Sequence, residues 1–306
     1  MNLFVSFRYL VALDDHRHFG RAALACHITQ PALSNALRGL EEHFGVALVR
    51  RGRQFAGFTA EGERILATAR RMQREHELLQ QDLHSRADAP SGHLTIGAVP
   101  TAMPVAARFA AQLQACHPGI LPNLRSMSSV ELETGLETLA LDMALGYAER
   151  RGASQAVPPP LLQYTERYFL VQRRKPGRKS VASHITWAEA AGLPLCLLSP
   201  EMHNRTVVDR AFADAGAAPQ VAIETNSTLA LALAVESGNV CSVMPGTLVA
   251  ALAGRGSLVA TPLVEPDVRV DIAFSVHPSN QPSHALRAAL QLAQDADWLQ
   301  GIQGLS

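Results

Sequence analysis

The stretch from residue 19 to residue 66 decides the fold of the N-terminal part, and it reads FGRAALACHITQPALSNALRGLEEHFGVALVRRGRQFAGFTAEGERIL. The small residues Ala22 and Ala23 indicate a short helix that can pack closely. The Thr29 hydroxyl can cap a following helix, and Pro31 is tolerated in the first turn of that helix. Apolar residues recur on one face of that following helix at Leu33, Leu37, Leu40 and Phe44.

A second face of the same helix carries three polar side chains, Gln30, Ser34 and Arg38. A helix fits the major groove of DNA, where such side chains can read base edges or contact flanking phosphates. The alternative is an ordinary amphipathic helix with a solvated polar face. Residues 46–59 favour the first interpretation, because two apolar segments flank a basic turn. We expect a β-ribbon there whose tip presents three arginines to a phosphate backbone: Arg50, Arg51 and Arg53.

The order of these parts resembles the signature of LysR-type transcriptional regulators. That signature has a paired-alanine helix, a recognition helix opening with a cap and Gln-Pro-Ala-Leu-Ser, a Leu-Glu-x-x-Phe-Gly exit, an arginine-bearing wing and a Thr-x-x-Gly helix start. The matching parts of this chain are Ala22-Ala23, Thr29 to Ser34, Leu40 to Gly45, Arg50-Arg51 and Thr59 to Gly62. Two positions depart from the pattern, since many members carry phenylalanine at Val49 and arginine at Asn35.

The resemblance implies a winged helix-turn-helix in residues 1–58 that binds double-stranded operator DNA. The side chains that it assigns to DNA are Thr29, Gln30, Ser34, Asn35, Arg38, Arg50, Arg51 and Arg53. The arginines of the wing would contact phosphates, and the helix would contact bases.

A long helix without further glycine or proline follows Gly62 and is expected from Thr59 to about Arg86, within a linker of residues 59–90. Spacings of four and three alternate along its apolar face at Ile65, Ala69, Met72, His76, Leu79 and Leu83. This is a heptad seam, and the resemblance implies that a second copy pairs with it. The alternative is a helix that packs on its own domain. We interpret His76 as a tolerated polar position rather than a pH switch.

Residues 91–306 alternate short apolar strands with amphipathic helices after a hinge-like segment, ADAPSG, at 87–92. The expected strands are 93–99, 120–127, 141–146, 193–198, 220–225, 240–244, 258–262 and 268–276. The expected helices are 102–116, 129–138, 201–215, 228–237 and 283–299. This alternation predicts an α/β fold with a mainly parallel sheet. The resemblance adds a two-lobed, periplasmic-binding-protein-like sensor, with lobe one at 92–162 and 270–306 and lobe two at 163–269.

Ligands of open α/β sheets bind where strand ends meet helix starts. The residues expected to bind an effector at such junctions are Pro100, Thr101, Ser128, Ser129, Tyr147, Ser199, His203, Arg205, Asn226 and Ser227. Helix N-termini favour anions, so a small carboxylate is the natural effector. The whole chain is also similar to regulators of formate dehydrogenase operons, which makes formate a candidate. The alternative is that these hydroxyls only cap helices and that the effector is neutral.

The composition limits the class of protein. The chain has 306 residues, 47% hydrophobic and 18% charged, which fits a globular protein of two or three domains. Its net charge of zero says nothing about DNA, but residues 1–57 carry seven arginines against four acids. The four cysteines lie far apart, so neither a disulfide nor a zinc site is expected. With no signal peptide and no long apolar run, we expect a cytoplasmic protein without a membrane partner.

Two other functions compete with this one. An enzyme is not expected, because the chain has no P-loop, HExxH, GxSxG or CxxC motif, and no cofactor or metal is expected either. A solute-binding transport protein would fit residues 91–306 alone, but the first ninety residues argue against it. The favoured interpretation is a transcriptional regulator that assembles as a homodimer and then a homotetramer, with its operator contact controlled by an effector.

Overall fold

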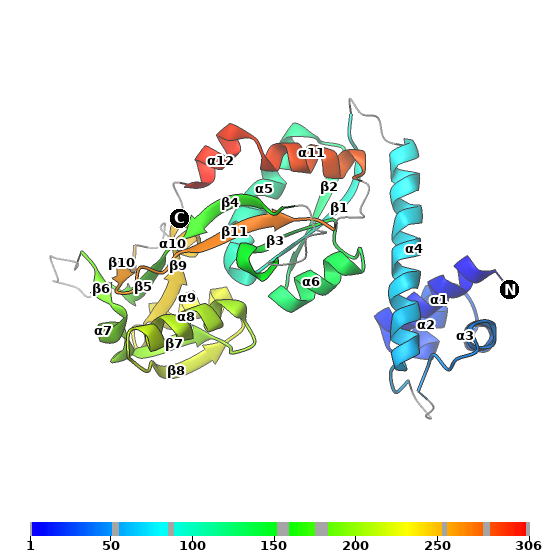
Figure 1. The fold of residues 1–306 in the computed structure, drawn as a ribbon, viewed down its shortest axis with the longest axis horizontal. Helices are drawn as coiled ribbons and strands as arrows, with labels where there is room; N and C mark the ends of the chain where they lie inside the picture. The colour runs from blue at the N-terminus through cyan, green and yellow to red at the C-terminus, as the bar shows by residue number, and fades with distance from the viewer. Residues whose placement is uncertain are drawn as a thin grey trace. The chain divides into compact units, whose positions relative to one another are not determined.

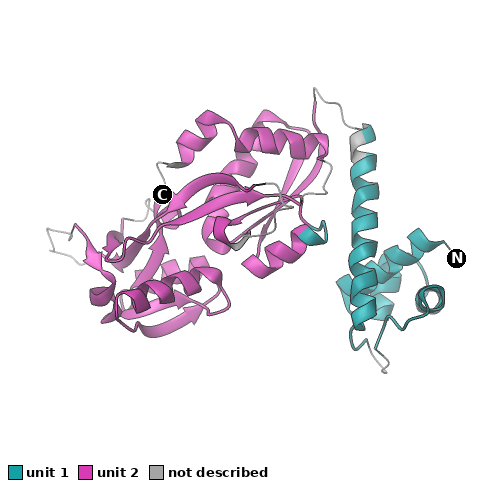
Figure 2. Cartoon of the chain, viewed as in Figure 1, with its two compact units in different colours: residues 1–86, 137–140 teal, residues 87–136, 141–306 magenta. Residues whose placement is uncertain are grey.

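The computed structural model describes residues 2–50, 55–84, 89–151, 159–174, 183–252, 256–277 and 282–303. The chain divides into two compact units (Figure 2). Unit 1 comprises residues 1–86 with 137–140, and unit 2 comprises residues 87–136 with 141–306. No helix within the described ranges is both long and apolar enough to cross a membrane.

Unit 1 is helical, and the blue and cyan ribbon of Figure 1 shows its elements: α1 (Leu3–His16), α2 (Phe19–Ala25), α3 (Gln30–Phe44) and α4 (Ala60–His84). Its core closes around leucines from α1, α3 and the start of the ribbon, all fully buried: Leu10, Leu13, Leu33, Leu40 and Leu48. The Thr29 hydroxyl accepts a hydrogen bond from the Ala32 amide at 3.4 Å, so the expected cap of α3 is confirmed.

A short antiparallel bridge between Val49 and Phe58 forms the base of the expected ribbon, whose tip at 51–54 lies outside the described residues. The Thr59 hydroxyl caps α4 by accepting from the Gly62 amide at 2.9 Å, and it donates to the Ala47 carbonyl at 2.6 Å. The first turn of α4 is therefore tied to the ribbon. A side chain at Gly62 would overlap the carbonyl oxygen of Leu48, which explains the glycine of the Thr-x-x-Gly pattern.

Among the described residues, the first sheet of unit 2 has five strands, in the order β2 (Ile120–Ser126), β1 (Gly92–Ala98), β3 (Met143–Tyr147), β11 (Val270–Ser275) and β4 (Leu161–Glu166). β1 runs parallel to both β2 and β3, whereas β11 is antiparallel to β3 and β4. The helices of this part are η1 (Pro100–Ala102), α5 (Met103–Cys116), α6 (Ser129–Glu137), η2 (Ala148–Arg151), α11 (His284–Ala293) and α12 (Ala296–Gln303).

The second sheet has the order β6 (Ile185–Thr186), β10 (Leu258–Val264), β5 (Tyr168–Arg173) and β9 (Ser242–Pro245). A single bridge between Leu195 and Cys241 joins it to a parallel pair, β7 (Pro194–Leu198) and β8 (Gln220–Thr225). Its helices are α7 (Trp187–Ala191), α8 (His203–Asp214), α9 (Thr228–Glu236) and α10 (Gly246–Leu252). The α/β class is thus confirmed, but the expectation of a mainly parallel sheet was wrong. Of the eight strand pairs in the described residues, four are antiparallel, because β11 runs against β3 and β4, and β5 runs against β9 and β10.

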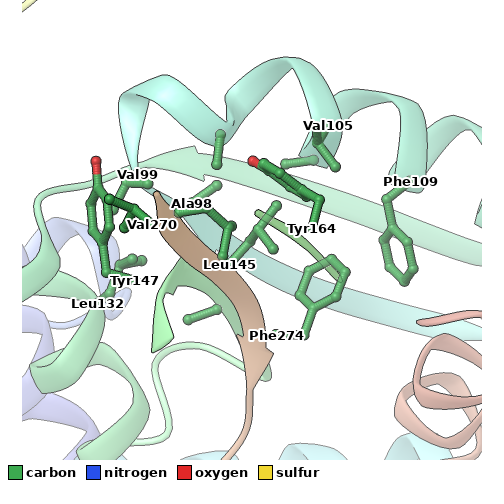
Figure 3. Close-up of a cluster of buried hydrophobic side chains, with 14 of the residues drawn as sticks. Ala98, Val99, Val105, Phe109, Leu132, Leu145, Tyr147, Tyr164, Val270 and Phe274 are labelled. Carbon is green, nitrogen blue, oxygen red and sulfur yellow. The ribbon is translucent and has the colours of Figure 1, made fainter. Parts of the chain in front are cut away.

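The chain changes sheets twice. β4 stays in the first sheet to Glu166 and β5 starts the second at Tyr168, so the first crossing is at Arg167, a few residues after the expected boundary at 162/163. The chain returns between β10 and β11. Figure 3 shows the core beside the first crossing, where Tyr147 and Tyr164 lie among the buried residues Val99, Val105, Leu145, Val270 and Phe274.

Each expected strand has a counterpart, but β4, β5, β6, α7 and α10 were not expected. The expected helix 283–299 was wrong in its length, because the chain breaks at Gln294–Asp295. Asp295 accepts from the Trp298 amide at 2.9 Å and starts α12 anew. β4 was missed because two polar residues inside it are buried, Gln163 and Glu166, and they blur the apolar pattern.

Replacing Gly62 tests the tie between α4 and the ribbon. Gly62→Ala should lower the free energy of unfolding by about 1–3 kcal/mol, because the added methyl group meets backbone that cannot yield. Gly301→Ala is the matched control, since nothing lies within 4 Å of that position and alanine favours a helix. Urea unfolding followed by circular dichroism measures both. Equal stability of the two variants would show that the close approach at Gly62 carries no constraint.

Candidate functional site

The polar face of α3 is open to solvent. Gln30, Asn35 and Arg38 are exposed and Ser34 is half-buried, whereas the leucines of the opposite face are packed inside unit 1. The Arg38 guanidinium donates to the Asn35 amide oxygen at 3.5 Å. Thr29 is exposed at the start of the helix. The structure therefore brings the polar side chains that were expected on α3 to one accessible surface.

The ribbon contributes one described arginine. The Arg50 backbone amide donates to the Gly57 carbonyl at 3.0 Å, and its side-chain Nε donates to the Phe58 carbonyl at 2.9 Å. Arg50 remains exposed, so its guanidinium is held on the ribbon without being buried. Arg51 and Arg53, which were expected at the tip, lie outside the described residues.

Unit 2 contains a small pocket where loops from its two sheets meet. Six of the ten residues expected to bind an effector line it: Pro100, Thr101, Ser128, Ser129, Tyr147 and His203. The remaining lining was not expected and comprises Val99, Leu198, Met202 and Asn204. The apolar members gave no chemical signal in the sequence, but the Asn204 amide stood next to His203. The free space is about 10 Å³, roughly what one water molecule needs.

Two hydroxyls of the pocket are removed from solvent. Ser129 is 7% exposed, and its Oγ has no hydrogen-bond partner among the described residues. Thr101 is 1% exposed, and its Oγ1 lies 3.4 Å from the Tyr147 hydroxyl. A buried hydroxyl without a partner is unfavourable, so Ser129 offers a donor that a ligand could satisfy.

The second sheet's side of the pocket is the start of α8. In the part of the chain that the structure describes, no side chain caps this helix start, where Met202 is the N-cap residue. The His203 Nε2 lies 3.0 Å from a Glu149 carboxylate oxygen, and its ring packs edge-on against Tyr147 at 4.5 Å. First-turn amides and the helix dipole give this end of α8 a partial positive charge.

Four expected residues lie outside the pocket lining: Ser199, Arg205, Asn226 and Ser227. The Arg205 guanidinium is committed elsewhere, because it donates to the Leu198 carbonyl at 2.9 Å and to the carboxylates of Asp209 and Glu224 at 2.8 Å each. Ser227 caps α9 by accepting from the Ala230 amide at 3.3 Å.

Ser128 has the features of an effector-binding residue and also those of a helix cap, the two roles considered for it in the sequence. It lines the pocket, but its hydroxyl also accepts from the Glu131 amide at 3.3 Å, and its own amide donates to the Glu131 carboxylate at 2.7 Å. It therefore acts as the cap of α6.

A buried polar cluster that the sequence did not reveal adjoins the pocket. Glu166 is fully buried, and its Oε1 accepts from the Thr247 hydroxyl at 2.8 Å and the Tyr164 hydroxyl at 3.4 Å. Burial raises the pKa of Glu166 to about 7, although both hydroxyls act in the opposite direction. The Asn204 side-chain amide, from the pocket lining, donates to the Tyr168 hydroxyl at 3.2 Å. Among the described residues no group of histidine, cysteine and acidic side chains could hold a metal ion.

Comparison with known families decides the identity of both parts. The family model of the LysR substrate binding domain matches residues 87–298, and that of the bacterial regulatory helix-turn-helix protein, lysR family, matches residues 4–63. The chain belongs to the LysR family. It is therefore a DNA-binding transcriptional regulator with an effector-binding domain, and it is not an enzyme.

Curated LysR relatives align along most of the chain. The DNA-binding transcriptional dual regulator OxyR of Escherichia coli (strain K12) is 28% identical over 295 residues, which cover 92% of this chain and 94% of that protein. The SDS degradation transcriptional activation protein of Pseudomonas sp. (strain ATCC 19151) is 28% identical over 259 residues, which cover 82% and 81%.

Solved structures share the fold. A full-length OxyR variant from Pseudomonas aeruginosa superimposes with a TM-score of 0.71 at 22% identity, covering 95% of this chain and 97% of that one. Full-length CbnR complexed with its target DNA gives a TM-score of 0.66 at 20% identity, covering 94% and 97%. These two likenesses support the winged helix-turn-helix and two-lobed architecture implied by the LysR resemblance.

Substitutions on α3 test its role in sequence recognition. Ser34→Ala and Arg38→Ala should each reduce the preference for a DNA fragment selected by the wild-type protein over random DNA, by about 1–3 kcal/mol for every base that the side chain reads. Ser237→Ala and Arg210→Ala, exposed positions of unit 2, are the controls for the removal of a hydroxyl and of a positive charge. Competition gel-shift titration measures the preference, and an unchanged preference would remove these side chains from the readout.

Proposed function

We propose that this LysR regulator binds operator DNA through residues 1–58, pairs with a second copy through residues 59–90 and senses a small carboxylate through residues 91–306. The contacts to DNA would come from the exposed polar face of α3 and from Arg50 on the ribbon. The effector proposal rests on one observation about Ser129. Its buried hydroxyl borders the pocket and has no hydrogen-bond partner among the described residues.

An anion suits the lining of this pocket. The described lining holds no acidic side chain, and its polar groups include the hydroxyls of Thr101 and Ser129 and the imidazole of His203. The uncapped start of α8 adds amide donors and a positive dipole end. The names of the relatives above do not refer to formate, so formate enters as one member of a panel.

The pocket also suits a ligand that changes the arrangement of the lobes. Thr101 and Ser129 belong to elements that flank the first sheet, whereas His203 and Asn204 begin α8, which packs on β7 of the parallel pair bridged to the second sheet. A ligand that contacts both groups favours the arrangement in which both can reach it. The same arrangement would set the position of the linker helices, and through them the spacing of the two DNA-binding heads.

Several relatives are named hydrogen peroxide-inducible genes activators, but the cysteines here give no support for peroxide as the effector. Cys196 is buried in a different core cluster from the one that Cys241 packs against, although the Cys196 amide donates to the Cys241 carbonyl at 2.8 Å. Burial also raises the pKa of the Cys196 thiol. Peroxide reacts with an accessible thiolate, so this environment works against such chemistry.

Removing hydroxyls from the pocket tests the effector proposal. Ser129→Ala should weaken the binding of the effector about tenfold or more, because a hydrogen bond to a charged group contributes about 1.5–3 kcal/mol. Thr101→Val should act in the same direction. Ser237→Ala removes a hydroxyl outside the pocket and should leave the affinity unchanged. Calorimetry with formate, acetate and larger carboxylates measures the affinity. Undiminished binding by both pocket variants would place the effector elsewhere.

The exposed apolar stripe on α4 supports the dimer. Met72, Leu79 and Leu83 have exposed fractions of 44%, 58% and 75%, whereas Leu66 and Ala69 pack inside unit 1. Three residues that were expected in the seam pack against unit 1 instead: Ile65 and Ala69 join its core, and the His76 ring lies 5.0 Å from Phe4 of α1. The seam left exposed in the described part of this chain therefore comes from the other three expected residues. Exposed apolar residues at heptad spacing are typical of a coiled-coil contact. We propose the same contact as the first step to a homotetramer.

Charges in the seam test this contact. Met72→Asp combined with Leu79→Asp should convert the proposed dimer to a monomer and abolish high-affinity operator binding. The reason is that an unpaired buried charge is strongly unfavourable. Met72→Leu combined with Leu79→Met keeps the seam apolar at the same positions and should behave as wild type. Light scattering gives the mass. If the aspartate variant retains the wild-type mass, the principal contact between copies lies elsewhere.

A further inference from the structure

We propose that the effector pocket takes up one proton at Glu166 for each small carboxylate that it binds. This inference rests on the proposed effector function and describes how the same site is regulated. It starts from the place of Glu166 in the fold. Glu166 ends β4, one residue before the chain crosses from the first sheet of unit 2 to the second. Its carboxyl accepts from Thr247 of α10 and from Tyr164 of β4, so it joins the two lobes.

The surroundings of Glu166 do not satisfy an ionised carboxylate. Both hydroxyls donate to Oε1, whereas the buried Oε2 has no hydrogen-bond partner among the described residues. An ionised carboxylate can accept about four hydrogen bonds, and burying its charge with fewer partners is costly. The protonated form is neutral and places a hydroxyl on one oxygen. The carboxyl therefore changes its charge near neutral pH, as its pKa of about 7 indicates.

The groups that face this carboxyl are hydroxyls rather than charges. They come from Tyr147 on β3, Tyr164 on β4, Tyr168 on β5 and Thr247 on α10. Burial raises the pKa of each of these three tyrosines, so they remain neutral donors at physiological pH. Within the described ranges, no charged side chain contributes to the pKa of Glu166 itself.

Charged groups on the neighbouring elements are engaged with other partners. On β11, Val270 pairs with Glu166. The residues on either side of Val270 bond elsewhere, Arg269 with Asp267 at 2.9 Å and Asp271 with Thr165 at 2.6 Å. At the pocket, His203 pairs with Glu149 at 3.0 Å. His203 is thus the alternative acceptor of a proton, and an experiment must separate it from Glu166.

The same tyrosines connect Glu166 to the pocket. Tyr147 lines the pocket, reaches the hydroxyl of Thr101, and feels the charge of Glu166. Tyr168 feels that charge as well, and it accepts from the pocket residue Asn204. A bound anion therefore adds a second negative charge to the cluster that holds Glu166. Like charges in a site of low dielectric constant favour protonation of one of them.

The thermodynamic linkage between anion binding and protonation of Glu166 then sets the direction in which the affinity changes with pH. If the anion makes protonation of Glu166 more favourable, the protonated protein binds the anion more tightly by the same factor. At pH 6 Glu166 already carries its proton, so binding takes up little. At pH 8 the free protein has mostly released this proton, so binding must restore it. The affinity for the anion should therefore fall as the pH rises above 7.

Calorimetry on the full chain counts these protons. Acetate is titrated at pH 6, 7 and 8 in two buffers of different ionisation enthalpy, with formate as a second anion and acetamide as the neutral control of the same shape. We expect uptake close to one proton per acetate at pH 8, falling toward zero at pH 6, and no uptake with acetamide. The Kd for acetate should rise about three- to tenfold per pH unit above pH 7.

Two variants assign the proton. Glu166→Gln keeps the shape and the acceptor for Thr247 but cannot ionise, so it should bind acetate without proton uptake and with a Kd that does not change from pH 6 to 8. Glu236→Gln, at the end of α9, is the matched control and should behave as wild type. Thr247→Val removes a donor that lowers the pKa of Glu166, so it should move the midpoint of uptake to higher pH. This second variant decides the question if Glu166→Gln does not fold.

The outcomes separate this inference from the function on which it rests. Proton uptake that persists in Glu166→Gln, or a midpoint that stays in place in Thr247→Val, assigns the proton to another group such as His203 and overturns the proposal. Binding of acetate or formate without any uptake also overturns it, while the effector function stands. If neither these two anions nor the larger carboxylates of the panel bind at any pH, the proposed effector function fails, and the coupling fails with it.

Discussion

The polar groups sealed between the two sheets of unit 2 impose the constraint on which the sensor depends. A carboxyl, three tyrosine hydroxyls and a threonine hydroxyl are removed from water here, and each must find a partner within the cluster. The partners come from both sheets, because Tyr164 and Thr247 reach Glu166 from opposite lobes. A change in the angle between the lobes would therefore break hydrogen bonds that no solvent replaces. The cluster therefore favours the arrangement of the lobes in which these hydrogen bonds form.

The pocket shares residues and hydrogen bonds with this buried polar cluster. Tyr147 belongs to both, and Thr101 and Asn204 touch it from the two sides. Ser129 keeps a buried hydroxyl without a partner among the described residues, so the pocket is incomplete in a specific way. The cost of that hydroxyl is recovered only when an acceptor arrives. A ligand that accepted this hydrogen bond would therefore stabilise the arrangement of lobes in which it binds, as the proposed sensor function requires.

The sequence predicted unit 1 well and unit 2 less evenly, and particular residues explain the difference. Unit 1 rests on local signals: Thr29 and Thr59 cap helices, and Leu33, Leu37 and Leu40 mark one face of α3. Such signals act over a few residues and are readable without a structure. In unit 2 the expected strands were found from their short apolar stretches, whether they pair in parallel or antiparallel. β4 was missed, since Gln163 and Glu166 are buried in the core and look like surface residues in a sequence.

The candidate site residues also divide into those that the sequence predicted and those that only the fold reveals. Six pocket residues followed from strand ends and helix starts, a rule of topology. Arg205 has the right charge and lies close to His203 on α8, yet Glu224 and Asp209 hold its guanidinium outside the lining, and only the fold brings β8 alongside.

Glu166 is the converse case, an acid that a sequence pattern assigns to the surface and that the fold buries completely. Natural sequences break the apolar pattern of a core where function repays the loss in stability. A lysine or arginine partner would have stabilised the ionised form of Glu166, but no charged side chain among the described residues contributes to its pKa. The burial of an acid with hydroxyl partners alone keeps its ionisation within the physiological range of pH. A cationic partner would instead fix the charge at every such pH, and the cluster could not respond to a second anion nearby.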